Sequence, residues 1–146
     1  MQHGKQIADN EFQAKADQLT MLRELVRDCL KKEGCGQDFI QRMVLAVNEA
    51  AMNIIQHAYN NQGEGIFRVT IDTDGKELTF CLTDFAPTVD KNIIKSRDLD
   101  DIRPGGLGVH FINELMDQVS YLESPEQEYG NTLQMKKKIE YLDYGI

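Results

Sequence analysis

The sequence has few cysteines and no long apolar run, and these absences exclude several classes of protein. Its three cysteines, Cys29, Cys35 and Cys81, are odd in number and form no close pair with metal-ligand spacing. They indicate reduced thiols rather than a disulfide framework or a zinc site. No stretch approaches the roughly 20 apolar residues that span a bilayer, and the first residues carry no apolar secretory signal. We therefore expect a cytoplasmic protein.

Positive charge is also scarce. The chain has 16 Lys and Arg residues against 24 Asp and Glu residues, a net charge of -8. Such a protein repels phosphate backbones and anionic lipid, so we expect neither nucleic acid nor a membrane as its main partner. A bound phosphate would have to be held locally, by backbone amides, a helix N-terminus or a metal ion.

The length and the residue pattern predict one domain, residues 1–146, of the α+β class. A chain of 146 residues has the usual size of a single domain. Asp17 is a candidate N-cap for a first helix that Gly34 stops, and Asp74-Gly75 is a hairpin signal. The expected elements are a strand at 7–16, a helix from Asp17 to Gly34, a second helix that begins after Asp38, runs through Ala58 and ends near 60–63, strands at 66–73 and 77–83, a helix beyond Gly108, and strands at 118–123 and 131–139.

Strands and helices occur in clusters along the chain. This order favours a two-layer α/β sandwich, with one mixed β-sheet and helices packed on one face. The stretch 85–108 is predicted to be a loop with one short helical turn at 92–96. A loop of this length inside a compact domain is more often functional than incidental.

Glu49 and Asn53 are the first candidates for a functional site. They are four residues apart, so on a helix both side chains project from one face, a turn apart. The surrounding helix is otherwise apolar, and burying a carboxylate and an amide there is costly unless something binds them. A metal ion or polar ligand would satisfy both; alternatively, the pair lies on the solvent edge of the helix. His57 continues the same line, either facing the site or serving as a capping or packing residue.

A glycine-rich segment, Gly105-Gly106-Leu107-Gly108, leads directly into the helix that begins at Val109. Glycines let backbone N–H groups approach an anion, and the helix N-terminus adds partial positive charge. The segment therefore fits a phosphate-binding loop, although a flexible connector would look the same. Neither a strand-bound GxGxxG nor a GxxxxGK[ST] motif is present, so Rossmann and Walker sites have no support.

Asp84 ends an apolar strand and is followed by Phe85-Ala86-Pro87. Its carboxylate could accept a hydrogen bond from an exocyclic amine such as that of adenine. Aspartates at strand ends also form turns, so this residue by itself leaves both interpretations open.

Taken in order, these features resemble the Bergerat-type ATP-binding fold shared by gyrase, Hsp90, MutL and histidine kinases. The resemblance is closest to its anti-sigma-factor serine/threonine kinase branch. Residues 45–59, LAVNEAAMNIIQHAY, are similar to the N-box of that branch, and residues 105–117, GGLGVHFINELMD, to its second glycine box. The match covers about residues 10–138, the expected core of the domain.

The resemblance implies a role for each matching residue. Glu49 would act as general base, Asn53 would ligate Mg2+, and Asp84 would contact the adenine amine. Gly106 and Gly108 would shape a lid over the phosphates, and Thr132 would support the adenine end. The residues expected to bind ATP or its Mg2+ are Asn53, His57, Asp84, Gly105, Gly106, Leu107, Gly108, Val109 and Thr132.

The same resemblance implies partners. It implies a small homodimer that binds a sigma factor and phosphorylates a serine on a STAS-type anti-sigma antagonist. A carboxylate at Glu49 favours a hydroxyl acceptor, because serine and water benefit from a positioned base whereas a histidine imidazole is already nucleophilic at neutral pH.

One departure affects this resemblance. The first glycine box of the superfamily is Asp-x-Gly, but Ala86 stands at the glycine position here and Pro87 follows. A methyl group where backbone freedom is needed would alter the fit of adenine. The alternative function is therefore a nucleotide-gated protein-binding switch with little or no kinase activity. A slow ATPase subunit is less favoured, since energy-coupling relatives resemble larger chains.

Overall fold

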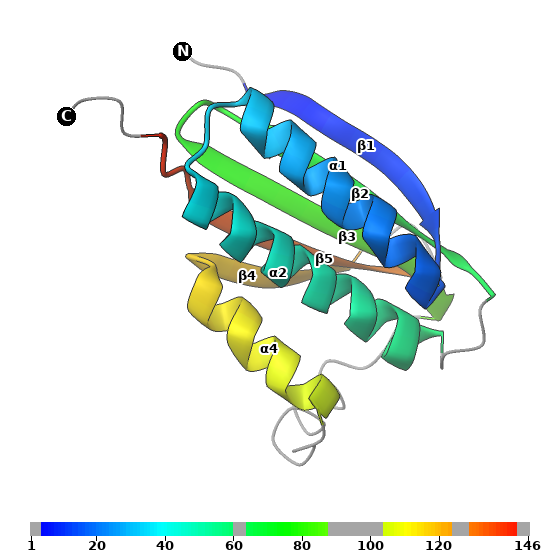
Figure 1. Cartoon of the computed structure of the whole chain (residues 1–146). Helices are drawn as coiled ribbons and strands as arrows, with labels where there is room; N and C mark the ends of the chain where they lie inside the picture. The colour runs from blue at the N-terminus through cyan, green and yellow to red at the C-terminus, as the bar shows by residue number, and fades with distance from the viewer. Residues whose placement is uncertain (1–3, 60–63, 88–103, 124–128, 143–146) are drawn as a thin grey trace.

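The computed structural model describes residues 4–59, 64–87, 104–123 and 129–142. Five strands and several helices are arranged as two layers in these ranges (Figure 1). The helical elements are the 3-10 turn η1 (Ala16–Gln18), α1 (Leu19–Lys32), α2 (Gln37–Asn53), the π-helix η2 (Ile54–Ala58) and α4 (Pro104–Leu115). The strands are β1 (Lys5–Gln13), β2 (Ile66–Thr73), β3 (Glu77–Pro87), β4 (Gln118–Glu123) and β5 (Tyr129–Lys138).

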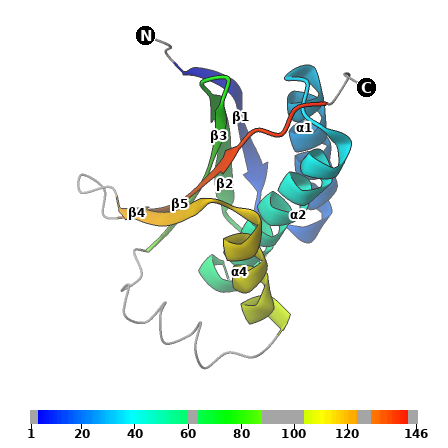
Figure 2. The ribbon, with the colours of Figure 1, turned by 90° about the vertical axis from the view of Figure 1, so that its left-hand side faces the viewer.

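The strands form one sheet in the order β1-β2-β3-β5-β4, and α1, α2 and α4 cover one of its faces (Figure 2). This arrangement confirms the predicted two-layer sandwich. All four described strand pairings are antiparallel, however, so the expectation of a mixed sheet is wrong. β3 and β4 do run in the same direction across the α4 connection. β5 lies between them and runs the opposite way, which makes every neighbouring pair antiparallel.

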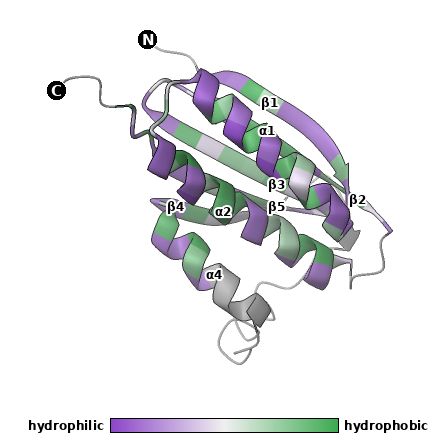
Figure 3. Ribbon diagram, in the orientation of Figure 1, coloured by the Kyte–Doolittle hydropathy of each residue, from purple (hydrophilic) through white to green (hydrophobic). Residues whose placement is uncertain are grey.

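The core lies between the sheet and the helices. Leu78, Phe80 and Leu82 of β3 are fully buried, whereas the residues that alternate with them on the other face are partly exposed. This period of two is that of a sheet with one covered face. Figure 3 shows hydrophilic and hydrophobic segments alternating along α1 and α2, as amphipathic helices require. The buried side chains of α2 are Phe39, Ile40, Met43, Val44, Ala46, Val47, Ala50 and Ala51.

The hairpin between β2 and β3 confirms the Asp-Gly prediction. The Asp74 carboxylate accepts hydrogen bonds from the backbone N–H groups of Lys76 and Glu77, both at 2.8 Å. Gly75 adopts a φ of 90°, a conformation that favours glycine. Local turn chemistry is thus sufficient to form this part of the sheet.

The first helix ends as predicted but begins differently. Gly34 has a φ of 81°, and the N–H groups of Gly34 and Cys35 bond to the carbonyls of Lys31 and Leu30. This is the Schellman pattern of a helix C-terminus. The expectation that Asp17 caps the N-terminus is wrong, because Asp17 lies inside η1 and α1 starts at Leu19 with no side-chain cap.

Other predicted boundaries shift by a few residues. The first strand occupies Lys5–Gln13, and β3 continues to Pro87, which closes it as expected. The predicted turn at 92–96 lies outside the described residues. None of the helices in the described ranges combines the length and the apolar character needed to cross a membrane.

Candidate functional site

Glu49 and Asn53 occupy the C-terminal half of α2 and are both half-buried. The guanidinium of Arg23 donates to the Asn48 side-chain oxygen at 3.0 Å, so the flank of α2 that carries Asn48 faces α1. Glu49 lies about 100° further around the helix, and α4 packs against α2 on the side away from α1 (Figure 1). The pair therefore lies on the outward flank of α2 toward α4, where both side chains remain accessible to a ligand.

The helix changes its geometry directly after Asn53. Ile54–Ala58 form a π-helix, whose turns are wider than those of an α-helix. His57 is exposed there. The position of His57 in line with Glu49 and Asn53, facing the same site, stays a prediction. π-Turns inside α-helices are often found at functional sites, and this one packs against β3.

Asp84 lies inside β3, on the face of the sheet that the helices cover. It is only 6% exposed, and its Oδ1 accepts a hydrogen bond of 2.9 Å from Nδ2 of Asn131, the residue opposite it on β5. A buried carboxylate is costly unless it is hydrogen-bonded, and the Asn131 amide supplies such a bond. The interpretation of Asp84 as a turn residue is wrong, because the strand continues past it to Pro87.

Thr132 does not lie on the same face as Asp84. It pairs with Thr83, and the two hydroxyl oxygens are 2.8 Å apart on the face of the sheet away from the helices. Directly opposite residues of an antiparallel pair share a face, and successive residues alternate. Asn131, one residue earlier, therefore occupies the position beside Asp84.

A break in strand register follows Asp84. β3 and β5 pair regularly as far as Asp84 and Asn131, and pair again at Pro87 and Tyr129. Ala86 lies in this irregular step and is still part of β3. On the partner strand, Gly130 has a φ of 120°, a value that favours glycine. Gly130 of β5, next to the residue that pairs with Asp84 of β3, thus has a backbone conformation that favours glycine.

The glycine-rich segment is helical rather than a loop. α4 begins at Pro104, so Gly105, Gly106, Leu107, Gly108 and Val109 form its first turns. Proline favours the first helical position because its φ is already suitable and its missing N–H is not needed there. The prediction of a loop before the helix is therefore wrong. The first four amides of any helix lack partners within it, so this end of α4 retains the backbone donors that a phosphate requires.

The residue types fit a nucleotide with Mg2+. Mg2+ prefers oxygen ligands, keeps several waters and is usually held by one or two protein groups together with substrate phosphates. The Asn53 amide oxygen and the neighbouring Glu49 carboxylate are ligands of that kind. Among the described residues no cluster of three or more His, Cys, Asp or Glu side chains could hold a metal by itself. A magnesium site here would therefore depend on the phosphates of a bound nucleotide.

Two residues beside the predicted site were missed. Asn131 could have been found from the alternation of β5, because Leu133 and Met135 face the core and Asn131 follows the same period. Tyr59 could not, since its hydroxyl contacts two strands, at Ile66 and Phe85. No sequence pattern predicts such contacts.

The sheet and the helix layer on one of its faces define the class of the fold as a two-layer α/β sandwich. Residues 12–137 match the family described as the histidine kinase-like ATPase domain. The chain belongs to this family.

The chain is also similar to individual members of this family. The chain is 27% identical over 148 residues to the serine-protein kinase RsbW of Staphylococcus aureus, an alignment that covers 95% of this chain and 91% of that protein. This similarity confirms the predicted resemblance to the serine kinase branch. The fold is similar to a structure of the SiaB-SiaC complex from Pseudomonas aeruginosa, with a TM-score of 0.62, 16% identity, and coverage of 90% of this chain and 89% of that one.

A second solved structure has the same fold. It contains the RsbU and RsbW domains of Rv1364c from Mycobacterium tuberculosis and matches with a TM-score of 0.60 at 14% identity. The match covers 93% of this chain and 35% of that longer one. At such identities the two structures support the fold alone.

Proposed function

We propose that this chain is a Mg-ATP-dependent serine/threonine protein kinase that acts as a cytoplasmic anti-sigma regulatory factor. It would bind a sigma factor or an equivalent regulator and phosphorylate a serine on a STAS-type anti-sigma antagonist. The observation that carries the proposal is the pair Glu49 and Asn53, one turn apart and half-buried on the flank of α2 toward α4. Membership of the ATPase family and similarity to a serine-protein kinase support it.

Each residue has a distinct part in this reaction. The serine oxygen attacks the γ-phosphorus, the bond from that phosphorus to the bridging oxygen of ADP breaks, and Glu49 accepts the hydroxyl proton. Asn53 would hold Mg2+, which neutralises charge on the phosphates. Asp84 would accept a hydrogen bond from the adenine amine, with its carboxylate oriented by Asn131.

A phosphorylation assay tests the proposal. The chain is incubated with labelled Mg-ATP and a candidate STAS protein, and Glu49→Gln is compared with Glu77→Gln. Glu77 is the matched control because it is also half-buried but lies at the opposite end of β3 from Asp84. Loss of a general base lowers the rate by about 100-fold or more. We expect this loss in Glu49→Gln, with ATP affinity retained, and a wild-type rate in Glu77→Gln.

Two results would contradict the kinase. A Glu49→Gln chain that labels the partner at the wild-type rate would exclude Glu49 as the base. Tight binding of the partner by the wild-type chain without any label, gated by ATP, would favour the nucleotide-gated switch. This second function remains the alternative, because the irregular pairing of β3 and β5 at Ala86 lies only two residues beyond Asp84.

We also propose that the chain forms a homodimer, as the resemblance implies. Light scattering on the purified chain measures this directly. A mass near 16.7 kDa, that of one chain, would contradict it.

A further inference from the structure

The hydroxyl of Tyr59 lies between the ends of two strands. Tyr59 follows η2, and its hydroxyl donates a hydrogen bond of 2.8 Å to the carbonyl oxygen of Ile66 on β2. The same oxygen accepts a hydrogen bond of 2.8 Å from the backbone N–H of Phe85 on β3. One side chain from the helix layer thus bonds to both strands at once.

These contacts replace a step of the β2–β3 ladder. Regular pairing of the two strands ends at Phe67 and Asp84. Continued in the same register, the next pair would be Ile66 and Phe85, and these are the residues whose backbone groups bond to the Tyr59 hydroxyl. The phenol oxygen therefore joins the strands at the step directly after Asp84, where β3 and β5 also lose their regular register.

The surrounding chain accommodates the Tyr59 ring closely. Gly65 has a φ of 101°, and a Cβ atom added there would lie 2.6 Å from Cε1 of Tyr59. Any other residue at this position would displace the ring. Burial raises the pKa of Tyr59; the hydrogen bond from the N–H of Phe85 opposes this, and the negative charge of Asp84 adds a smaller increase. The hydroxyl therefore keeps its proton and remains a donor to Ile66 at neutral pH.

We propose that Tyr59 is a positioning residue that sets the preference of the nucleotide site for ATP over GTP. It joins the end of the helix that carries Asn53 to the chain immediately after Asp84, and so fixes where the Asp84 carboxylate lies. This inference rests on the proposed function, in which Asp84 accepts a hydrogen bond from the adenine amine. Guanine presents a carbonyl oxygen at the corresponding position, and a carboxylate held rigidly there repels it.

Tyr59→Phe tests the inference, because it removes the hydroxyl and keeps the ring. The matched control is Tyr141→Phe, whose hydroxyl donates to the carbonyl of Gly75 in the β2–β3 turn, at the other end of the sheet from Asp84. Dissociation constants of Mg-ATP and Mg-GTP are measured by calorimetry on the full chain. We expect ATP binding to weaken about tenfold in Tyr59→Phe, because a displaced Asp84 carboxylate loses most of its charge-assisted hydrogen bond to the adenine amine, with a much smaller change for GTP.

The ratio of the two affinities separates positioning from general destabilisation. Tyr141→Phe should lower the melting temperature without changing this ratio, whereas Tyr59→Phe should lower the preference for ATP. An unchanged ATP-to-GTP ratio in Tyr59→Phe, or equal losses for both nucleotides, would overturn the inference. A wild-type chain that binds no ATP at all would instead overturn the proposed function itself, and this inference with it.

Discussion

The most unusual single residue is Asp84, a carboxylate almost completely buried in the middle of a sheet. Its neighbours on the covered face of β2 and β3, Phe67 and Leu82, are apolar and fully buried. Asn131 donates to it from the opposite strand. A polar pair in this environment contributes less to stability than an apolar pair would, which indicates that it is retained for another purpose. We attribute that purpose to recognition of the nucleotide base.

Asn131→Ala is expected to weaken both the fold and the nucleotide site. Removal of a hydrogen bond to a charged group lowers the free energy of unfolding by about 1.5–3 kcal/mol. ATP affinity should fall several-fold, because the Asp84 carboxylate is no longer oriented by the amide. Urea denaturation measures the first effect and calorimetric titration with Mg-ATP the second.

Thr132→Val provides the control. It removes the hydroxyl pair with Thr83 on the other face of the sheet, so stability should decrease while ATP affinity is unchanged. If Thr132→Val weakened ATP binding as much as Asn131→Ala, the site would extend through the sheet and the assignment of Asn131 would be wrong.

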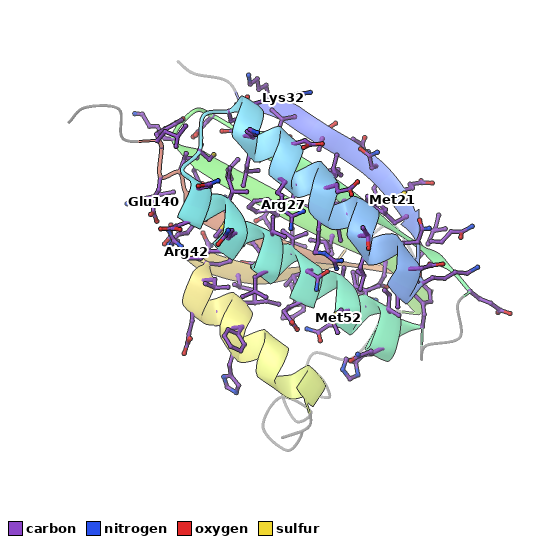
Figure 4. The ribbon with its side chains drawn as sticks, viewed as in Figure 1. Met21, Arg27, Lys32, Arg42, Met52 and Glu140 are labelled. Carbon is purple, nitrogen blue, oxygen red and sulfur yellow. The ribbon has the colours of Figure 1, made fainter. Side chains whose placement is uncertain are left out.

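At the scale of elements, the segment after β5 ties the two layers together. The N–H of Ile139 bonds to the carbonyl of Lys76 at 2.8 Å, next to the β2–β3 turn. The N–H of Gly36 bonds to the carbonyl of Glu140 at 2.8 Å, and that of Leu142 to the carbonyl of Gly34 at 3.0 Å. The segment therefore links the sheet to the turn between α1 and α2. Arg42 on α2 also lies beside Glu140 (Figure 4), with hydrogen bonds of 3.2 and 2.7 Å.

A chain that ends at Lys138 should be markedly less stable. It loses these three backbone hydrogen bonds, each worth about 1 kcal/mol net, so the free energy of unfolding should decrease by roughly 3 kcal/mol. Glu140→Gln in the full chain is the comparison, since it disrupts only a partly exposed ion pair that solvent screens, at a cost well below about 1 kcal/mol. Urea unfolding midpoints measure both. A truncated chain with the wild-type midpoint would show that the segment does not contribute.

In the whole molecule, the proposed ligand contacts come from both layers of the sandwich. Asp84 and Asn131 belong to the sheet, whereas Glu49 and Asn53 belong to α2. A nucleotide that contacts both layers binds only the folded chain and must stabilise it by mass action. The thermal stability of the protein therefore reports on the site without the need for a protein substrate.

Mg-ATP should raise the melting temperature. At 100 times its dissociation constant a ligand contributes about 2.7 kcal/mol, which corresponds to roughly 8 °C for a domain of this size. Asn53→Ala should remove the part of the shift that depends on Mg2+. Asn48→Ala should keep it, because Asn48 is also half-buried on α2 but accepts its hydrogen bond from Arg23 of α1. Equal losses in the two variants would exclude a specific role for Asn53 in binding the metal.

Much of the architecture was predictable because it depends on neighbours in the chain. The Asp74-Gly75 turn, the glycine stop at Gly34 and the amphipathic helices each follow from a few adjacent residues, and all are confirmed. The four-residue spacing of Glu49 and Asn53 likewise places their side chains one turn apart on any α-helix. Local stereochemistry alone accounts for these successes.

The errors of prediction arose where backbone geometry departs from the simplest assumption. The glycine-rich segment was expected to be a loop, since glycines destabilise helices by about 1 kcal/mol each, yet it forms the first turns of α4. The second helix, expected to continue regularly through Ala58, changes to a π-helix after Asn53.

The sequence by itself therefore determined the family, the order of the elements and the candidate residues of a nucleotide site. Only the tertiary structure decided that β5 lies between β3 and β4, that Asn131 rather than Thr132 faces Asp84, and that Tyr59 bridges β2 and β3. The physical reason is common to all three. Strand register and side-chain bridges depend on groups that are distant in the chain, and they are selected by burial and hydrogen bonding across the whole core.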